Sequence, residues 1–180
     1  MFPIIDVSGN VIAFGGRVMD DSKPKYKNTS DTPVFKKSRN LFALNFAKNS
    51  CQDALILCEG YMDVISMHQA GFLNAVATLG TAITSEHSRV VSRYAKTAYL
   101  AYDSDEAGKK AADKAMTLLN EVGVETKIIQ MKDVKDPDDY IKLHGARAFS
   151  ELLYGSVGQI DFKLNGVISK YDLSNPDEKL

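Results

Sequence analysis

Two apolar runs, each followed by acidic residues, place the strongest constraint on how this chain can fold. Residues 55–58 (LILC) lead directly into Glu59, and residues 99–102 (YLAY) lead into Asp103 and Asp105. An uninterrupted apolar run of this kind predicts a strand buried on both faces, and a helical pattern follows each run. The repeated strand–turn–helix unit predicts an α/β fold with a compact, mainly parallel sheet flanked by helices.

The acids after the two runs are expected to meet, because the carboxyl ends of neighbouring parallel strands line one crevice. Glu59, Asp63, Asp103 and Asp105 are therefore predicted to share a site. Crowded carboxylates raise one another's pKa unless cations neutralise them, and we assign no cationic side chain to these acids from their own segments. Oxygen-only ligation favours a hard divalent cation, Mg²⁺ or Mn²⁺, over zinc or copper.

A capping role is the alternative for each of these acids. Asp and Glu are common at helix N-termini, where they accept hydrogen bonds from free N–H groups and interact favourably with the helix dipole. Capping alone would account for Asp105, which precedes a long Ala- and Lys-rich helical pattern. It does not account for Glu59, because a carboxylate that closes a buried strand is costly without a partner.

A third acidic element follows the next predicted strand, near residues 124–130. Asp136 has the pattern of a helix N-cap, with Pro137 at the first helical position and more acids in the first turn. Capping is the stronger interpretation of Asp139. Asp136 and Asp138 are candidates to complete the metal site, because the end of this strand should lie near the same crevice.

The acidic motifs, in this order and spacing, resemble the TOPRIM domain. They are Glu59-Gly60-Tyr61-Met62-Asp63, Asp103-Ser104-Asp105 and Asp136-Pro137-Asp138. Further matches narrow the resemblance to the catalytic core of the bacterial replicative DNA primases, over roughly residues 1–155. These matches are Phe14-Gly15-Gly16-Arg17, Pro24-Lys25-Tyr26, Phe35-Lys36-Lys37, Leu79-Gly80-Thr81-Ala82 and Asp103-Ser104-Asp105-Glu106-Ala107-Gly108.

The resemblance implies a role for each acid. Glu59 would be the general acid/base or an acid beside the metal, while Asp103 and Asp105 would be the principal metal ligands. Asp63 would be a further catalytic acid, and Asp136 and Asp138 would be further metal ligands. The resemblance also implies a basic groove that contacts phosphates of the DNA template, the primer or the incoming nucleotide, formed by Arg17, Lys25 and Lys37.

The implied activity is synthesis of short RNA primers from ribonucleoside triphosphates on a single-stranded DNA template. It would be a nucleotidyl transfer that depends on Mg²⁺, for which Mn²⁺ can substitute, in the bacterial cytoplasm at the replication fork. In this family, zinc and the replicative helicase bind through domains that this sequence does not contain. Both ends are therefore expected to continue in a longer protein, and the isolated piece is expected to be weakly active or inactive.

Two other functions share part of this pattern. A topoisomerase or a nuclease of the overcoming-lysogenization type would use the same acids, although a topoisomerase needs a catalytic tyrosine on a separate domain. A non-catalytic DNA-binding module, as in recombination mediators, would use the fold for assembly. The complete acidic set together with the basic stretch favours the primase.

The basic stretch is local, because the whole chain has a formal net charge of −1. Between residues 17 and 39 there are seven basic residues against three acids, a local balance of +4, with Tyr26 and Phe35 interleaved. Such a segment beside an acidic site suits contact with a phosphate backbone. The alternative is an ordinary solvated loop.

Three parts are expected along the chain. Residues 1–50 would be the remnant of an N-terminal basic subdomain, residues 51–144 the TOPRIM domain, and residues 145–180 the start of a C-terminal helical subdomain. In the first part we expect a hairpin (2–7 and 11–18), a loop (20–33) and a short helix (38–47). In the second we expect strands near 54–59, 73–78, 97–102 and 124–130, and helices near 61–70, 84–95, 105–122 and 137–144.

The C-terminal part is expected to be helical from residue 146, and to end in a frayed polar tail over residues 172–180. Its apolar positions are Phe149, Leu152, Leu153, Ile160, Phe162, Leu164, Val167 and Ile168. No apolar run reaches the length of about 18 residues that a membrane helix needs, and no signal peptide is recognisable. The two cysteines, Cys51 and Cys58, suggest neither a disulfide nor a zinc site.

Overall fold

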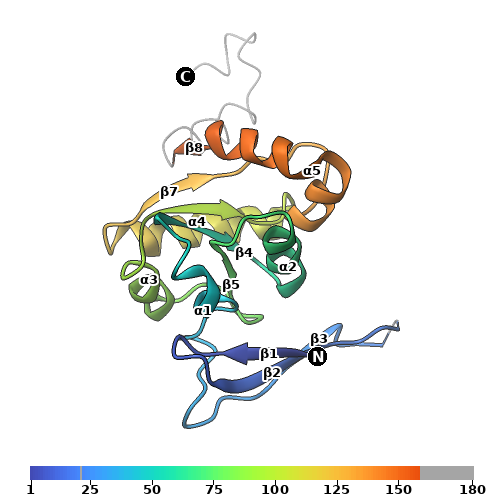
Figure 1. The fold of residues 1–180 in the computed structure, drawn as a ribbon, viewed down its shortest axis with the longest axis vertical. Coiled ribbons are helices and arrows are strands. Elements are labelled where there is room, and N and C mark those ends of the chain that lie inside the picture. Colours follow the sequence, from blue (N-terminus) through green and yellow to red (C-terminus); the bar gives the residue numbers. More distant parts are fainter. Residues whose placement is uncertain (21, 159–180) are drawn as a thin grey trace, which may run out of the picture.

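The computed structural model describes residues 1–20 and 22–158, which form two β-sheets flanked by helices (Figure 1). The strands of the larger sheet are, in spatial order, β5 (Ala75–Ala77), β4 (Asp53–Cys58), β6 (Ala95–Ala101), β7 (Glu125–Ile128) and β8 (Val157–Gly158). All of these run parallel to their neighbours except β8, which is antiparallel to β7. The predicted mainly parallel sheet with flanking helices is confirmed.

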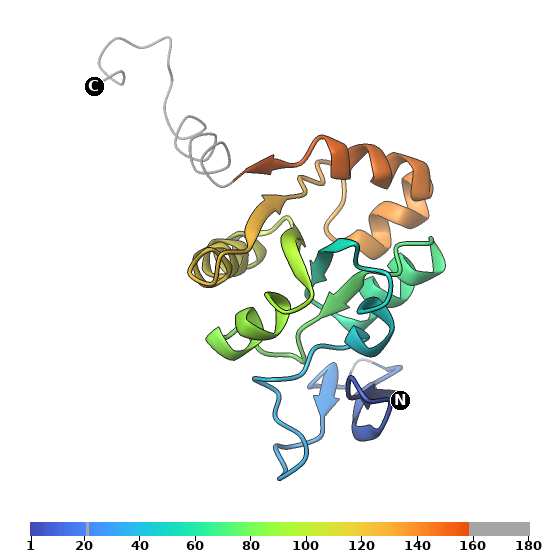
Figure 2. The same cartoon turned by 60° about the vertical axis from the view of Figure 1, so that its left-hand side comes forward.

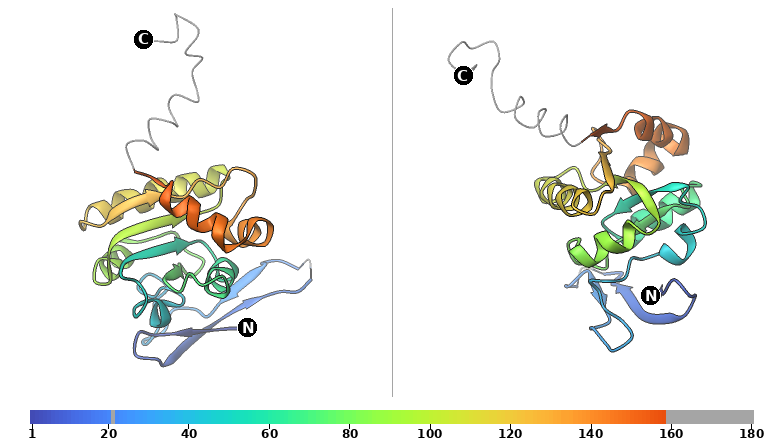
Figure 3. Two further views of the ribbon diagram at one scale, coloured as in Figure 1. Left: turned by 45° about the horizontal axis from the view of Figure 1, so that its top comes forward. Right: turned by 90° about the vertical axis from the view of Figure 1, so that its left-hand side faces the viewer.

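Helices cover both faces of this sheet. They are α1 (Leu44–Ala47), α2 (Tyr61–Gln69), α3 (Ser85–Val91), α4 (Glu106–Asn120) and α5 (Pro137–Tyr154). Leu55 and Leu57 of β4 pack with residues of α3 and α4, whereas Ile56 and Cys58 pack with residues of α2 and α5. Figure 3 shows the two helix pairs on opposite sides of the sheet. Burial on both faces explains why residues 54–58 of β4 form an uninterrupted apolar run.

The smaller sheet is antiparallel and consists of β1 (Phe2–Ile5), β2 (Val11–Arg17) and β3 (Tyr26–Asn28). Figures 1 and 2 place it below the larger sheet, at the end away from β7 and β8. Its hydrophobic core is formed by Ile4, Ala13 and Phe35 with Tyr61 and Leu79, which come from the larger unit. The smaller sheet therefore packs on the larger unit through a core to which both contribute.

Some expected elements differ from the observed ones. The predicted loop at 20–33 contains β3, whose strand state comes from pairing with β2 rather than from an apolar pattern. The predicted helix at 38–47 is reduced to α1, because Phe42 pairs with Ala77 as a β-bridge and Ala43 has a φ of 65°. The helices expected before and after residue 145 form α5, which bends at Gly145 (φ 81°).

Part of the expected C-terminal structure lies outside the described residues. This part comprises the helical pattern at Ile160, Phe162, Leu164, Val167 and Ile168, and the frayed polar tail over residues 172–180. Within residues 1–20 and 22–158, none of the helices is long and apolar enough to cross a membrane.

Tyr61 joins the two sheets. Its side chain is 3% exposed, its ring stacks on Phe2 at 5.1 Å between centroids, and it meets Phe42 edge-on at 4.7 Å. Its hydroxyl donates a 2.6 Å hydrogen bond to Oδ1 of Asn28, on β3. Gly15 of β2 lies directly against this ring, since a Cβ there would sit 2.8 Å from the Tyr61 hydroxyl. The glycine thus permits close approach of a buried side chain.

We predict that Gly15→Ala lowers the free energy of unfolding by about 1–3 kcal/mol, because the added methyl overpacks a fixed aromatic contact. Gly16→Ala is the matched control, since a Cβ there would first meet Sδ of Met1 at 3.3 Å, at the end of a flexible side chain. Urea unfolding of both variants provides the measurement. Equal midpoints for the two variants would contradict the close packing at Gly15.

Candidate active site

A cavity of about 530 Å³ lies where the carboxyl end of the larger sheet faces the smaller sheet. The register of the strands aligns Cys58 with both Ala77 and Ala101, so the residues that follow these strands lie at one level. Six carboxylates line the cavity: Glu59, Asp63, Asp103, Asp136, Asp138 and Asp139. Four cationic side chains also line it: Arg17, Lys25, Lys135 and Lys142.

Glu59 links the ends of the two central strands. It follows β4 directly, and its Oε1 accepts a 3.1 Å hydrogen bond from the backbone N–H of Asp103, the second residue after β6. Burial of the carboxyl group and the neighbouring charge of Asp103 raise the pKa of Glu59. The buried strand end therefore has a partner for its acid, as a polar group in this position requires.

Asp103 and Asp105 share a cationic partner, the ammonium of Lys135. Lys135 Nζ lies 3.2 Å from Oδ2 of each aspartate. Burial raises the pKa of Asp103 even though Lys135 opposes the shift. Hydrogen bonding from the Gly108 N–H, followed by that of Lys135, lowers the pKa of Asp105. No cationic side chain was assigned to these acids from their own segments, and the partner comes from another one, the loop between β7 and α5.

Asp105 also caps α4, since its Oδ1 accepts a 2.9 Å hydrogen bond from the Gly108 N–H. Gly108 is required at this point, because a Cβ there would lie 2.0 Å from the backbone oxygen of Asp103. The first turn of α4 therefore packs directly on the turn that carries both aspartates. Capping and ion pairing use different oxygens of Asp105, so the two interpretations of this acid are compatible.

Asp63 is the most strongly perturbed acid of the cavity. It is 8% exposed in the first turn of α2, and its Oδ2 accepts a 3.0 Å hydrogen bond from the Gly60 N–H. Burial, and after it the charge of Asp136, raises the pKa of Asp63 to about 7. A carboxyl group with this pKa can exchange a proton near neutral pH.

The acids at the start of α5 have separate partners. Asp136 caps the helix, accepting a 2.8 Å hydrogen bond from the Asp139 N–H, with Pro137 at the first helical position as predicted. Asp138 pairs with Lys142 at 2.7 Å and accepts a hydrogen bond from the Ser66 hydroxyl. Burial opposes ionisation of Asp138, but these contacts lower its pKa.

The basic wall of the cavity comes from the smaller sheet. Arg17 ends β2 and lies over the ring of Tyr26, 5.7 Å from its centroid, while Lys25 precedes β3. Tyr26 and Asn28 line the cavity, whereas Lys27 between them does not, as expected from the alternation of side chains along a strand. Arg17 and Lys25 therefore face the carboxylates across the cavity.

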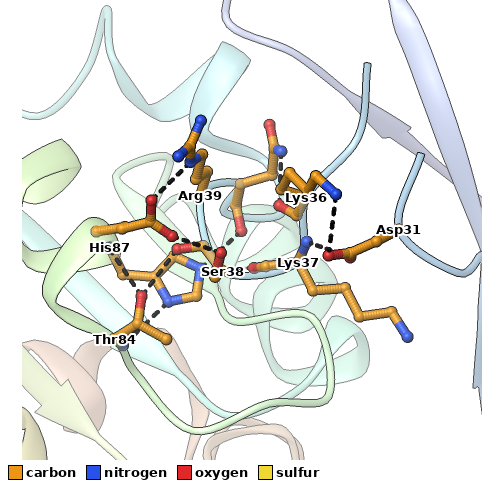
Figure 4. A network of polar contacts seen from close by, with 9 residues as sticks. Asp31, Lys36, Lys37, Ser38, Arg39, Thr84 and His87 are labelled. Atoms are coloured by element: carbon orange, nitrogen blue, oxygen red, sulfur yellow. Dashed lines mark hydrogen bonds and ion pairs between the residues drawn. The ribbon is translucent and has the colours of Figure 1, made fainter. Parts of the chain in front are cut away.

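Lys37 lies apart from this cavity, in a polar network that Figure 4 shows. Its backbone oxygen accepts a 2.8 Å hydrogen bond from Nε2 of buried His87, and its N–H donates to Asp31. Figure 4 shows the Lys37 side chain extending away from the network, so the backbone of the segment is fixed while its ammonium remains available. Of the three predicted phosphate contacts, two line the cavity and Lys37 does not.

The donors of the site are chemically suited to a hard divalent cation, because all of them are carboxylate oxygens. Nevertheless, within the residues described here, no group of three or more His, Cys, Asp or Glu side chains is already arranged to hold a metal ion. The contacts above give the reason. Lys135 occupies the space between Asp103 and Asp105, and Asp63 and Asp136 each direct an oxygen to a backbone N–H.

Two family models match the chain. Residues 56–141 match a model described as Toprim-like, and residues 1–48 match the DNA primase catalytic core, N-terminal domain. A curated DNA primase from Clostridium acetobutylicum is 45% identical over 178 residues, which cover 98% of this chain and 30% of that protein. Over almost its whole length, the chain is therefore similar to the catalytic core of DNA primases.

Solved primase structures have the same fold. A structure of the Aquifex aeolicus primase with its zinc-binding and RNA polymerase domains has a TM-score of 0.84 and 40% identity, over 89% of this chain and 40% of that one. A primase catalytic domain bound to single-stranded DNA has a TM-score of 0.86 and 36% identity, over 99% of this chain and 58% of that one. The chain spans about 30% of the length of the curated primases that it matches.

Three polar residues of this primase-core site were missed in the sequence. Lys135 and Lys142 flank the acidic motif at Asp136–Asp139 in the chain, which was analysed for its acids alone. Asn28 lay in a predicted loop, but it connects the two sheets through Tyr61 and through a 2.8 Å hydrogen bond to the backbone oxygen of Leu79. The basic residues next to the acids were the available signal for the two lysines; Asn28 had none.

We predict that Asp63→Asn stabilises the protein at alkaline pH. Folded Asp63 keeps its proton up to about pH 7, whereas the unfolded chain loses it near the ordinary value of 3.8, so stability falls as pH rises between these values. In metal-free buffer the variant should be more stable than wild type near pH 8, by on the order of 2 kcal/mol, and equal to it near pH 4.

Asp105→Asn is the control of opposite sign. Because the pKa of folded Asp105 is lowered, its ionised carboxylate stabilises the folded protein at pH values above the ordinary pKa of 3.8. The substitution should therefore destabilise the protein near neutral pH and have no effect in strong acid. Urea unfolding across the pH range measures both variants. If the difference in unfolding free energy between Asp63→Asn and wild type does not change with pH, the raised pKa of Asp63 is contradicted.

Proposed function

We propose that this chain is the nucleotidyl-transfer segment of a DNA primase, which joins ribonucleotides into short RNA primers on a single-stranded DNA template. The observation that carries the proposal is that carboxylates and cationic side chains face each other across one cavity. Phosphoryl transfer needs groups that stabilise developing charge and cations that hold phosphates in line. The primase relative bound to single-stranded DNA supports this choice of template.

Asp103 and Asp105 are the proposed principal ligands for Mg²⁺, for which Mn²⁺ can substitute, with Glu59, Asp136 and Asp138 as supplementary oxygen donors. When bound, such ions stabilise negative charge on the attacking and leaving oxygens of an in-line displacement. The close packing of Gly108 against Asp103 fixes the turn that carries both principal ligands. The site is thus supported by main-chain packing and not by side chains alone.

Glu59 and Asp63 are the proposed proton-handling residues. Each has a raised pKa, which keeps a proton available closer to neutral pH than an ordinary carboxyl group would. The hydrogen bond from the Asp103 N–H fixes the Glu59 carboxyl group beside the principal ligands. Glu59 is therefore in position to take the proton that the attacking hydroxyl group releases.

Arg17 and Lys25 are proposed to bind phosphates of template, primer or incoming nucleotide. Lys37, which lies outside the cavity, is proposed to contact phosphates farther along the strand. Tyr61, which lies two residues before Asp63, packs 5.1 Å from Phe2 of β1 and 6.1 Å from Tyr26 of β3 between ring centroids, so packing sets the distance between the basic wall and the carboxylates of the cavity. This arrangement would hold a phosphate chain against the metal ligands.

We propose that the chain is organised as a basic segment (1–50), a metal-binding catalytic domain (51–144) and a third part that begins at residue 145. Zinc would belong to a separate domain, as in the Aquifex aeolicus primase, and the replicative helicase would bind elsewhere in the whole protein. Because its relatives are bacterial primases, we place its action at the bacterial replication fork, in the cytoplasm. The chain alone should make little primer, since few phosphate contacts leave template binding weak.

A nuclease, a topoisomerase or a non-catalytic recombination module would share the acidic edge. The match of residues 1–48 to the N-terminal domain of the primase catalytic core favours the primase, because those residues form the basic wall. Incorporation of ribonucleotides on single-stranded DNA by a full-length protein that carries this segment distinguishes the candidates. Strand cleavage without incorporation would favour the nuclease, and binding without either would favour the module.

We predict that Asp103→Asn weakens Mn²⁺ binding to the chain by about tenfold or more, because one charged ligand of a small set is lost. Calorimetry with Mn²⁺ measures the binding. In a full-length primase that carries this segment, the same change should abolish primer synthesis. Asp113→Asn, an exposed site on α4, removes an equal charge and should change neither property. Mn²⁺ binding unaffected by Asp103→Asn would contradict the ligand assignment.

We predict that Lys25→Ala weakens binding of single-stranded DNA without changing sequence preference, because the contact is to phosphate. The slope of log affinity against log salt should fall by about 0.7 for the lost contact. Lys27→Ala is the matched control, since Lys27 lies two residues away but does not line the cavity. Fluorescence anisotropy over a salt series gives the comparison, and equal losses in the two variants would indicate a diffuse charge effect.

A further inference from the structure

Lys135 occupies the centre of the acidic edge. Its ammonium lies 3.2 Å from Oδ2 of Asp103 and 3.2 Å from Oδ2 of Asp105, so one cation bridges both proposed principal metal ligands. The lysine side chain is 59% exposed and Asp103 only 20%. The ammonium therefore reaches the acids from the solvent side, the direction from which a dissolved cation would arrive.

Backbone contacts fix the loop that carries this lysine. The Ser104 N–H, between the two aspartates in the chain, donates a 2.8 Å hydrogen bond to the backbone oxygen of Lys135. The Ser104 hydroxyl donates a 3.0 Å hydrogen bond to the backbone oxygen of Val134. Two hydrogen bonds thus attach the start of the Lys135 side chain to the turn between its partners. The bridge is a built feature and not a chance pairing of surface charges.

A divalent cation and this ammonium cannot share the position. Mg²⁺ would bind carboxylate oxygens of Asp103 and Asp105 at about 2.0–2.1 Å, and Lys135 Nζ already lies 3.2 Å from one oxygen of each. Placing two cations there would add repulsion at close range.

We propose that Lys135 is a displaceable counter-ion, which neutralises Asp103 and Asp105 in the metal-free protein and transfers to a substrate phosphate when a divalent cation takes its place. The inference rests on the proposed metal site. Because the backbone of Lys135 stays attached through Ser104, the displaced ammonium remains at the same cavity as Arg17 and Lys25. It there adds a third cation for the triphosphate of the incoming nucleotide.

The exchange couples the two binding steps. Without metal, the lysine is held by the aspartates and is not available to phosphate. When the metal binds, the Lys135 ammonium is released and becomes available to a phosphate of the nucleotide. Nucleotide should therefore bind more tightly in the presence of the divalent cation, in part through Lys135, and by linkage the nucleotide should strengthen metal binding equally.

The test is Mn²⁺ calorimetry on the chain with Lys135→Met, without nucleotide. Loss of the competing ammonium should make Mn²⁺ bind about three- to tenfold more tightly, from the modest strength of exposed ion pairs. Lys132→Met, from the same loop but without a contact to these acids, removes an equal charge and should shift the affinity less than twofold. Circular dichroism confirms that each variant is folded.

A second measurement uses ATP at saturating Mn²⁺. Lys135→Met should bind the nucleotide about three- to tenfold more weakly than wild type, so the substitution moves metal and nucleotide affinity in opposite directions. In wild type, the ¹³Cε signal of Lys135 should shift when Mg²⁺ is added, which reports release of the ammonium without any substitution.

The outcomes separate the inference from the function on which it rests. If wild type binds Mn²⁺ and Lys135→Met binds it equally or more weakly, the counter-ion role is overturned while the metal site stands. If Lys132→Met tightens binding as much as Lys135→Met, the effect is one of general charge and the role is also overturned. If neither wild type nor Lys135→Met binds Mn²⁺, the proposed metal site itself fails.

Discussion

The parallel register between β4 and β6 is the constraint on which the rest of the structure depends. Cys58 pairs with Ala101, and the hydrogen bond from the Asp103 N–H to Glu59 continues the alignment beyond the strands. A shift of one residue would exchange the two faces of β4, moving Leu57 and Cys58 into each other's cores, and would separate these two acids. The apolar packing of the sheet and the chemistry of its edge are therefore set by the same register.

Neutralisation of charge dominates the cavity. Asp103, Asp105 and Asp138 have lysine partners, whereas Glu59 and Asp63 rely on backbone N–H groups. The two groups differ in consequence: the acids without a cationic partner have raised pKa values, and Asp105 and Asp138, which have one, have lowered values. Asp103 departs from this division because its burial outweighs the effect of Lys135. One acidic edge thus contains both protonatable and firmly ionised carboxyl groups.

The sequence allowed prediction of those features that short-range patterns encode. Burial on both faces leaves a continuous apolar run in β4, and the Asp136–Pro137 pair encodes the start of α5, so both could be located from the sequence. The strand state of β3 could not, because it comes from pairing with β2. Nor could the pairing of Lys135 with Asp103, since it depends on how the loop after β7 packs on the turn at Ser104. The sequence thus identified which acids line the site, but not the side chains that pair with them.

Asn28 connects the two walls of the cavity. Its amide nitrogen donates to the backbone of Leu79, and its amide oxygen accepts from Tyr61, so one side chain fastens β3 to two segments of the larger unit. The two walls therefore cannot separate unless both hydrogen bonds break and the stacked ring of Tyr61 is exposed to water. Contacts within the protein therefore hold the two walls of the cavity together, and they do so without any bound ligand.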